Sequence, residues 1–213
     1  MSDTGYEPPV RFQGSRLARV LLAAAGWEVL ADDFPTRQGV AIVYPHTSNW
    51  DFVVGILAKW SIGIPVRFWG KDALFRVPLF GHWLRWLGGI PLDRRSPRGA
   101  VGAMVNTMRQ AVAGDQMFWL ALSPEGTRGR TAGWRSGFYQ VALGAQVPLA
   151  LVVLDYGRRQ VRIQHFMRPS GDVTLDYQYM AGVFEHARGM RPQQASPIQP
   201  MPKTDKGSIK GSI

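Results

Sequence analysis

A histidine and an aspartate five residues apart form the clearest candidate for acid–base chemistry. His46 follows a short apolar run at residues 40–44, and Asp51 stands near the start of the next predicted helix. A histidine can take a proton from a substrate when a carboxylate orients its ring and stabilises the imidazolium ion. A structural histidine beside a carboxylate that caps a helix would show the same spacing. The spacing alone leaves both interpretations open.

The chain lacks the usual protein nucleophiles. It has no cysteine and no serine in a G-x-S-x-G pattern. A base at His46 would therefore activate a hydroxyl of the substrate, in direct acyl or phosphoryl transfer, or water in a hydrolysis. For acyl transfer we expect backbone amides near residues 47–49 to stabilise the oxyanion.

A second cluster, SPEGTRGR at residues 123–130, follows a predicted strand at 117–122. Gly126 permits a tight turn that exposes backbone amides to an anion. Arg128 can hold a phosphate with two hydrogen bonds, and Glu125 can orient an arginine or accept a bond from a substrate hydroxyl. A turn held by ordinary salt bridges is the alternative.

A third cluster is the basic and aromatic stretch at residues 67–98, which has seven cations, two acids and six Phe or Trp residues. It includes Lys71, the pair Gly88-Gly89, where a ligand could approach the backbone closely, and Arg94, placed after a predicted strand to reach a bound anion. A solvated basic face over core aromatics is one alternative. Single-stranded nucleic acid is another, because it binds basic surfaces that carry aromatic rings.

The whole chain is strongly basic. Its 213 residues include 25 Lys or Arg against 15 Asp or Glu, and 20 of the cations are Arg. This balance favours an anionic partner: nucleic acid, an acidic membrane, a phosphorylated substrate or an acidic carrier protein. The four histidines have no metal-binding spacing, and no P-loop occurs, so we expect neither a metal nor a resident cofactor.

Alternating strand and helix patterns predict one α/β domain with a mostly parallel sheet. Predicted strands lie at 40–44, 64–69, 89–92, 117–122 and 147–155, with an antiparallel strand at 160–166 near the C-terminal end. Predicted helices lie at 51–62, 96–114, 136–144 and 174–187, and Pro78 and Gly81 favour two short helices within 72–87.

The two ends of the chain differ from this pattern. Residues 11–30 predict an amphipathic N-terminal helix, which would suit a membrane interface or pack on its own domain. The apolar part, 17–30, is too short to span a bilayer. Residues 189–213 are rich in proline and polar residues and predict a flexible tail. We therefore expect an N-terminal segment at 1–36, a main domain at 37–188 and a tail at 189–213.

Taken in order, these clusters resemble the glycerolipid acyltransferase family that includes bacterial 1-acyl-glycerol-3-phosphate acyltransferases. The family blocks H-x4-D, G-G-x4-R, F-P-E-G-T-R-S and V-P-I-x-P resemble residues 46–51, 88–94, 123–128 and 147–152, and a K-x-x-L-F-x-x-P-x-F-G pattern resembles 71–81. Pro45, Ser123, Gly129 and Leu151 depart from these patterns, which leaves the acceptor open.

The resemblance implies transfer of an acyl chain from a thioester to a hydroxyl, at the cytoplasmic face of the cell membrane. His46 would be the base and Asp51 its partner. The acceptor would be bound by Lys71, Arg94, Glu125, Gly126, Thr127 and Arg128. The donor would be acyl-CoA or acyl-carrier protein, and the acceptor lysophosphatidic acid, another lysophospholipid or an amino-lipid hydroxyl.

Two other functions stay open at this point. A nucleic-acid-binding module would explain the basic, aromatic stretch, but it would not explain the pair His46 and Asp51. A catalytically silent membrane-binding homologue would keep the fold without the reaction, although the presence of both residues argues against it.

Overall fold

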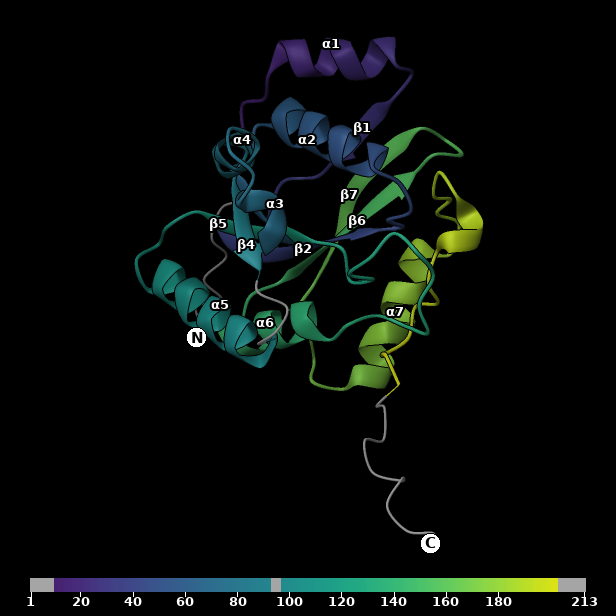
Figure 1. Ribbon diagram of the computed structural model, residues 1–213. Helices are drawn as coiled ribbons and strands as arrows, with labels where there is room; N and C mark the ends of the chain where they lie inside the picture. Colours follow the sequence, from purple (N-terminus) through teal and green to yellow (C-terminus); the bar gives the residue numbers. More distant parts are fainter. Residues whose placement is uncertain (1–9, 93–96, 203–213) are drawn as a thin grey trace, which may run out of the picture.

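A seven-stranded sheet forms the centre of the computed structural model, which describes residues 10–92 and 97–202 (Figure 1). The strand order across the sheet is β1-β7-β6-β2-β5-β3-β4. The strands are β1 Glu28–Ala31, β2 Gln38–Tyr44, β3 Val66–Lys71, β4 Gly89–Leu92, β5 Phe118–Leu122, β6 Leu149–Asp155 and β7 Gln160–Met167. All neighbouring strands are parallel except β6 and β7, as the sequence predicted.

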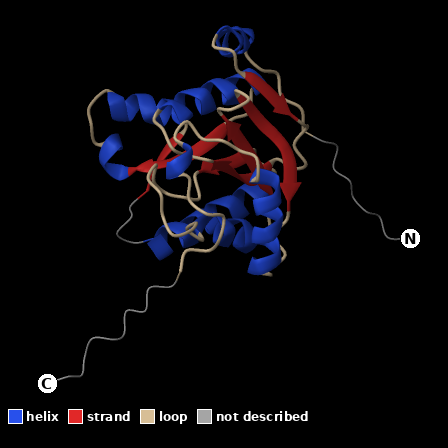
Figure 2. Cartoon of the chain, turned by 90° about the vertical axis from the view of Figure 1, so that its right-hand side faces the viewer, coloured by secondary structure: helices blue, strands red, loops and turns tan. Residues whose placement is uncertain are grey.

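Helices cover both faces of this sheet (Figures 1 and 2). The helices are α1 Arg16–Ala24, α2 Trp50–Ile62, α3 Asp72–Phe75, α4 Phe80–Trp86, α5 Pro97–Ala113, α6 Gly137–Ala145 and α7 Val173–Phe184, with a 3-10 turn at Pro192–Gln194. α5, α6 and α7 bury one apolar cluster, which includes Trp134 and Phe138, against one face. α1 and α2 cover a second cluster around Trp119 on the other face.

The central strands are buried on both sides, which explains their continuous apolar sequences. β6 is buried along its whole length, and only one residue of β2 is less than fully buried. Strands covered on both faces by helices show such runs instead of alternating polar and apolar residues. Because β2, β5 and β3 are parallel, their carboxyl ends meet at one edge of the sheet, and the loops that follow them lie together.

The predicted helix over residues 11–30 is confirmed only for residues 16–24. α1 ends at Ala24, and Gly26 follows with φ +74°, a left-handed conformation that favours glycine and turns the chain. Residues 28–31 then form edge strand β1, which pairs in parallel with β7. Within residues 10–92 and 97–202, no helix is long and apolar enough to cross a membrane.

The segment after Gly189 also differs from the expected flexible tail. Residues 189–202 run back across the ends of the strands, and Ser196 is buried. Trp134 donates its backbone N–H to Gln199 and accepts one from Met201, at 2.7 and 2.8 Å. These hydrogen bonds and the burial of Ser196 hold the segment in place. Residues 203–213 lie outside the described part.

Candidate active site

His46 and Asp51 come together at the carboxyl end of β2. The His46 Nδ1 lies 3.0 Å from Asp51 Oδ2, and the His46 side chain is 25% exposed. The backbone N–H groups of Thr47 and Ser48 donate to the same Asp51 oxygen, at 2.7 and 2.8 Å. The hydrogen bonds tie the loop after β2 to the first turn of α2 and leave Nε2 as the ring nitrogen for substrate chemistry.

Asp51 keeps its charge although it is only 4% exposed. Burial by itself would raise the pKa of this carboxyl group. Hydrogen bonds from His46, Ser48 and the Tyr156 hydroxyl outweigh burial, so the pKa lies below its ordinary value. A charged carboxylate at this place can fix the tautomer of His46 and stabilise its imidazolium form.

The expected oxyanion donors near residues 47–49 are wrong for two of the three amides. The N–H groups of Thr47 and Ser48 point to Asp51 and are already engaged. A backbone amide that holds a carboxylate in place is no longer directed at a developing charge on the substrate. The backbone amides of Thr47 and Ser48 therefore hold the Asp51 carboxylate in place.

Glu125 reaches the same site from the loop after β5, the strand beside β2. Its side chain is fully buried and accepts backbone hydrogen bonds from His46 at 2.7 Å and from Ser196 at 2.8 Å. Burial raises its pKa, although the two backbone donors act in the opposite direction. The structure thus places Glu125 behind His46 as a link between three segments of the chain.

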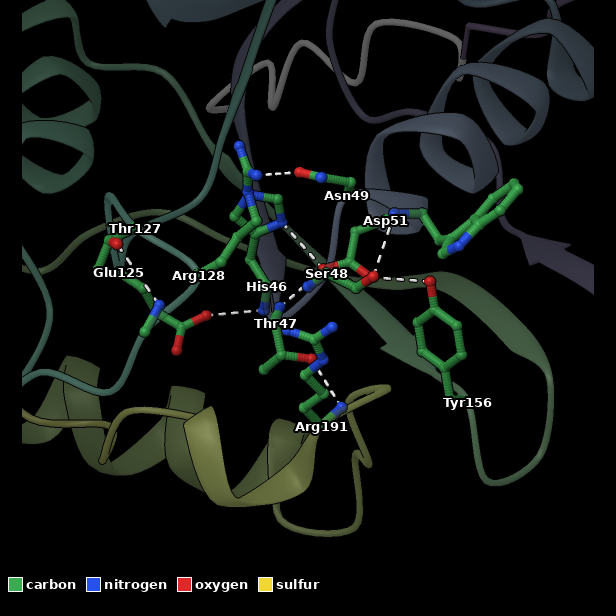
Figure 3. A network of polar contacts seen from close by, with 12 residues as sticks. His46, Thr47, Ser48, Asn49, Asp51, Glu125, Thr127, Arg128, Tyr156 and Arg191 are labelled. Carbon is green, nitrogen blue, oxygen red and sulfur yellow. Dashed lines mark hydrogen bonds and ion pairs between the residues drawn. The ribbon is translucent and has the colours of Figure 1, made fainter.

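The rest of the 123–130 loop is more exposed. Arg128 is exposed and its guanidinium contacts the Asn49 side chain, so this loop and the His46 loop meet (Figure 3). Thr127 is exposed and its hydroxyl accepts a hydrogen bond from the Gly129 N–H. Gly126 has φ +67°, and a Cβ there would lie 2.7 Å from the Arg135 side chain, so only glycine suits this turn.

The structure describes only some of the residues of the third cluster. Lys71 is exposed at the end of β3, which lies beyond β5 from β2. Arg94 lies outside the described residues. Gly88 has φ +99° where the chain turns into β4, and a Cβ on Gly89 would lie 2.8 Å from the Leu84 carbonyl oxygen. The pair thus serves tight packing within the chain.

The segment 188–202 contains site residues that sequence analysis missed. The Arg191 N–H donates to Thr47 Oγ1 at 3.1 Å, and the side-chain amide group of Gln194 lies 3.1 Å from the Thr47 carbonyl oxygen. The Tyr44 hydroxyl donates to the Ser196 carbonyl at 3.0 Å. We name residues 188–202 the C-terminal strap. It has no helical or strand periodicity, so no pattern in the sequence indicated its place.

Tyr156 was missed as well. Its hydroxyl donates to Asp51 Oδ1 at 2.8 Å, opposite the oxygen that contacts His46 (Figure 3). It follows the last residue of β6, whose apolar run was predicted. The position at the carboxyl end of a central strand was the signal available in the sequence.

An apolar cavity of about 210 Å³ extends from His46 and Asp51 between α2 and the sheet. Its wall includes Phe52, Gly55 and Ala58 from α2 and Val152 from β6. Lys59 also lines it and donates to the Leu87 carbonyl at 2.6 Å. An apolar space with a few polar groups at one end is typical of a site for a ligand with a hydrocarbon part. In the part of the chain that the structure describes, no three acidic or histidine side chains gather as a metal would need.

The chain is similar in sequence to known proteins. The acyltransferase family profile matches residues 28–155. Chloroplastic 1-acyl-sn-glycerol-3-phosphate acyltransferases of Brassica napus and Arabidopsis thaliana are each 29% identical, over 112 and 126 residues. These matches cover 51% and 58% of this chain but 32% and 34% of the relatives, so the matched region is about a third of their length.

A solved structure shares the fold. The 1-acyl-sn-glycerophosphate acyltransferase PlsC from Thermotoga maritima aligns with a TM-score of 0.50 and 18% identity, over 79% of this chain and 73% of that one. The family match begins at β1 and ends with the last residue of β6, so it includes both His46 and Asp51. On this match, the chain belongs to the acyltransferase family.

Proposed function

We propose that this protein transfers a fatty acyl chain from a thioester donor to a hydroxyl of a lysophospholipid, with His46 as general base. The observation that carries the proposal is the contact between His46 and the buried Asp51 at one end of an apolar cavity. Family membership and the names of the plant relatives support the same reaction class.

In the proposed reaction His46 Nε2 removes the proton from the acceptor hydroxyl as its oxygen attacks the thioester carbonyl carbon. Asp51 stabilises the imidazolium that forms. The tetrahedral intermediate collapses, the carbon–sulfur bond breaks, and His46 returns the proton to the departing thiol. Each proton and electron pair is accounted for without a covalent enzyme intermediate, which agrees with the absence of cysteine and of a serine elbow in the sequence.

The apolar cavity is the proposed site for the acyl chain. It begins beside His46 and Asp51 and continues along the inner side of α2. A chain that enters it removes apolar surface from water, which stabilises the bound donor by about 0.8 kcal/mol for each methylene. The donor would be acyl-CoA or acyl-carrier protein.

The acceptor is proposed to bind on the exposed side of His46. Arg128 stands there on the loop after β5 and can hold a phosphate. Lys71, Arg94, Gly126 and Thr127 are proposed as further acceptor contacts, and Glu125 supports them from behind His46. Lysophosphatidic acid is the acceptor that the names of the relatives favour.

The test is a direct assay of acyl transfer. Purified protein is incubated with labelled acyl-CoA or acyl-carrier protein and a panel of lysolipids, and the products are identified by mass spectrometry. We expect a diacyl product from a phosphorylated lysolipid. His46→Ala should lower the rate by about 10²–10⁴-fold, the usual contribution of a positioned base. Full acyl transfer by a folded His46→Ala protein would refute the assignment.

We also propose that the protein works at the cytoplasmic surface of an anionic membrane. Large apolar side chains stand exposed on α1, α2 and α4, among them Leu17, Val20, Leu21, Trp50, Val53, Trp60, Trp83 and Trp86. Arg16, Arg19, Arg76 and Arg85 are exposed on or beside the same helices. Tryptophan and arginine together suit a lipid interface with acidic headgroups. α2 would then present one side to the membrane and the other to the cavity.

Vesicle flotation tests this surface. Trp86 is 72% exposed on α4, and Leu175 is 61% exposed on α7, on the opposite face of the sheet. Trp86→Asp should weaken binding to vesicles that contain phosphatidylglycerol, whereas Leu175→Asp should leave binding unchanged. Equal losses in the two variants would argue against a membrane surface formed by α1, α2 and α4.

A further inference from the structure

The Asp51 carboxylate has two oxygens, and the H-x4-D motif explains the contacts of only one of them. Oδ2 accepts from His46 and from two backbone amides, whereas Oδ1 accepts from the Tyr156 hydroxyl at 2.8 Å. Tyr156 lies one residue past the end of the family match. A side chain outside the matched region therefore contacts the partner of the proposed base.

The surroundings of Tyr156 hold its hydroxyl in place. Its ring packs edge-on against Trp27, with the ring centres 4.8 Å apart. Its backbone N–H donates to the Arg188 carbonyl of the C-terminal strap at 2.8 Å. Asp155, directly before it, is buried and accepts from Gly157 and Arg158 in the turn that follows. Packing and hydrogen bonds on both sides thus fix the direction of the O–H group.

We infer that Tyr156 is a positioning residue that holds Asp51 and limits how strongly Asp51 attracts a proton on His46. This inference rests on the proposed role of His46 as a base. The phenol donates to Oδ1 and so reduces the negative charge available at Oδ2, which faces the imidazole. Less negative charge at Oδ2 stabilises the imidazolium form less, and a base must be neutral to accept a proton.

Other charged groups surround the pair and are held constant in the test. Glu125 accepts the backbone N–H of His46, and Arg128 contacts Asn49. Charged residues of the other elements packed here are Lys59 on α2, Arg130 on the loop after β5, Asp155 at the end of β6 with Arg158 in the turn after it, and Arg188 and Arg191 on the strap.

The test uses Tyr156→Phe, which removes the hydroxyl and keeps the ring against Trp27. Tyr139→Phe is the matched control, because the Tyr139 hydroxyl donates to another buried carboxylate, that of Asp176, at 2.7 Å. Two quantities are followed in each protein: the midpoint of the His46 imidazole titration by NMR, and the pH dependence of kcat/KM for acyl transfer.

In Tyr156→Phe we expect the His46 midpoint and the acidic limb of kcat/KM to move up together by about half to one pH unit. Activity below that limb then falls by roughly three- to tenfold, since one unit of pH changes the neutral fraction tenfold. KM for both substrates stays the same. Tyr139→Phe should shift neither quantity, even if it lowers thermal stability.

The outcomes separate this inference from the proposed reaction. An unmoved His46 midpoint in folded Tyr156→Phe would overturn the inference, whatever the activity. If no protein transfers acyl groups but the midpoint still moves, the inference about Tyr156 holds and the proposed reaction fails. In an Asp51→Asn background the Tyr156→Phe change should no longer move the midpoint, and a shift that persists there would also refute the role through Asp51.

Discussion

A substitution at Gly55 can shorten the proposed acyl site without changing His46 or Asp51. It lies in the middle of α2 and lines the apolar cavity. A Cβ at this position would meet no atom within 4 Å, so a side chain can extend into the empty space without displacing its neighbours. In Gly55→Leu, four carbon atoms would occupy room that the proposal gives to the donor's hydrocarbon chain.

The size of the effect follows from the hydrophobic energy of each excluded methylene. Each contributes about 0.8 kcal/mol, or roughly a fourfold change in kcat/KM. If leucine displaces two to four methylenes, the longest accepted donors should lose about 15- to 200-fold in kcat/KM relative to donors shorter by that number. Leucine also has a better helix propensity than glycine by about 1 kcal/mol, so the variant should not unfold.

The assay measures kcat/KM over a series of acyl donors of increasing length. Gly102→Leu is the control, because Gly102 lies on α5 across the sheet and its Cβ would also meet nothing within 4 Å. We expect the optimum to move to shorter donors in Gly55→Leu and to stay in place in Gly102→Leu. A folded Gly55→Leu protein with the original length profile would show that the acyl chain binds elsewhere.

Three further changes test the site. Arg128→Ala should raise the KM for a phosphorylated acceptor by about 10- to 100-fold and change kcat little, because Arg128 would bind the phosphate equally in the ground state and in the transition state. An unchanged KM would show that Arg128 is not part of the acceptor site. Glu125→Gln should lower the free energy of unfolding by about 1–3 kcal/mol in urea titrations, because the single oxygen of the glutamine amide can accept a hydrogen bond from only one of the two backbone N–H groups. An unchanged free energy of unfolding would contradict the described contacts. The lowered pKa of Asp51 gives the folded state extra stability above about pH 4, which is lost as pH falls through the folded pKa. Asp51→Asn should therefore melt with a weaker pH dependence than the parent protein below pH 4, and identical curves would contradict this.

The strands that are buried on both faces could be predicted, because their sequences are continuous apolar runs. β2 and β6 are continuous apolar runs, and the polar residues that follow β2 and β5 lie at the edge expected for a site. The sequence of β1 has no such apolar run. Its four residues are exposed or half-buried at the edge of the sheet, and its partner β7 lies 132 positions further along the chain. Local periodicity carries no information about that pairing.

In the site, the sequence predicted some of the contacts and missed others. His46 and Asp51 meet as their spacing indicated, because a short loop and the first turn of a helix bring them together. Glu125 was expected to face a substrate, but its carboxyl group is buried and accepts hydrogen bonds from two backbone amides. Ser196 could not be predicted at all, because its place depends on hydrogen bonds to loops far away in the chain and not on any hydrophobic pattern.

The C-terminal strap gives the folding of this chain an order in time. Its bonds to Thr47 and Tyr44 join residues 144 and 152 positions apart. On a ribosome, the strands and helices up to α7 emerge before the strap does, and domains fold as their residues become available. The loop that carries His46 therefore receives these supports only after the whole sheet and the helices up to α7 have been synthesised. A nascent chain with a complete sheet would still lack the hydrogen bonds that the strap makes to Thr47 and Tyr44.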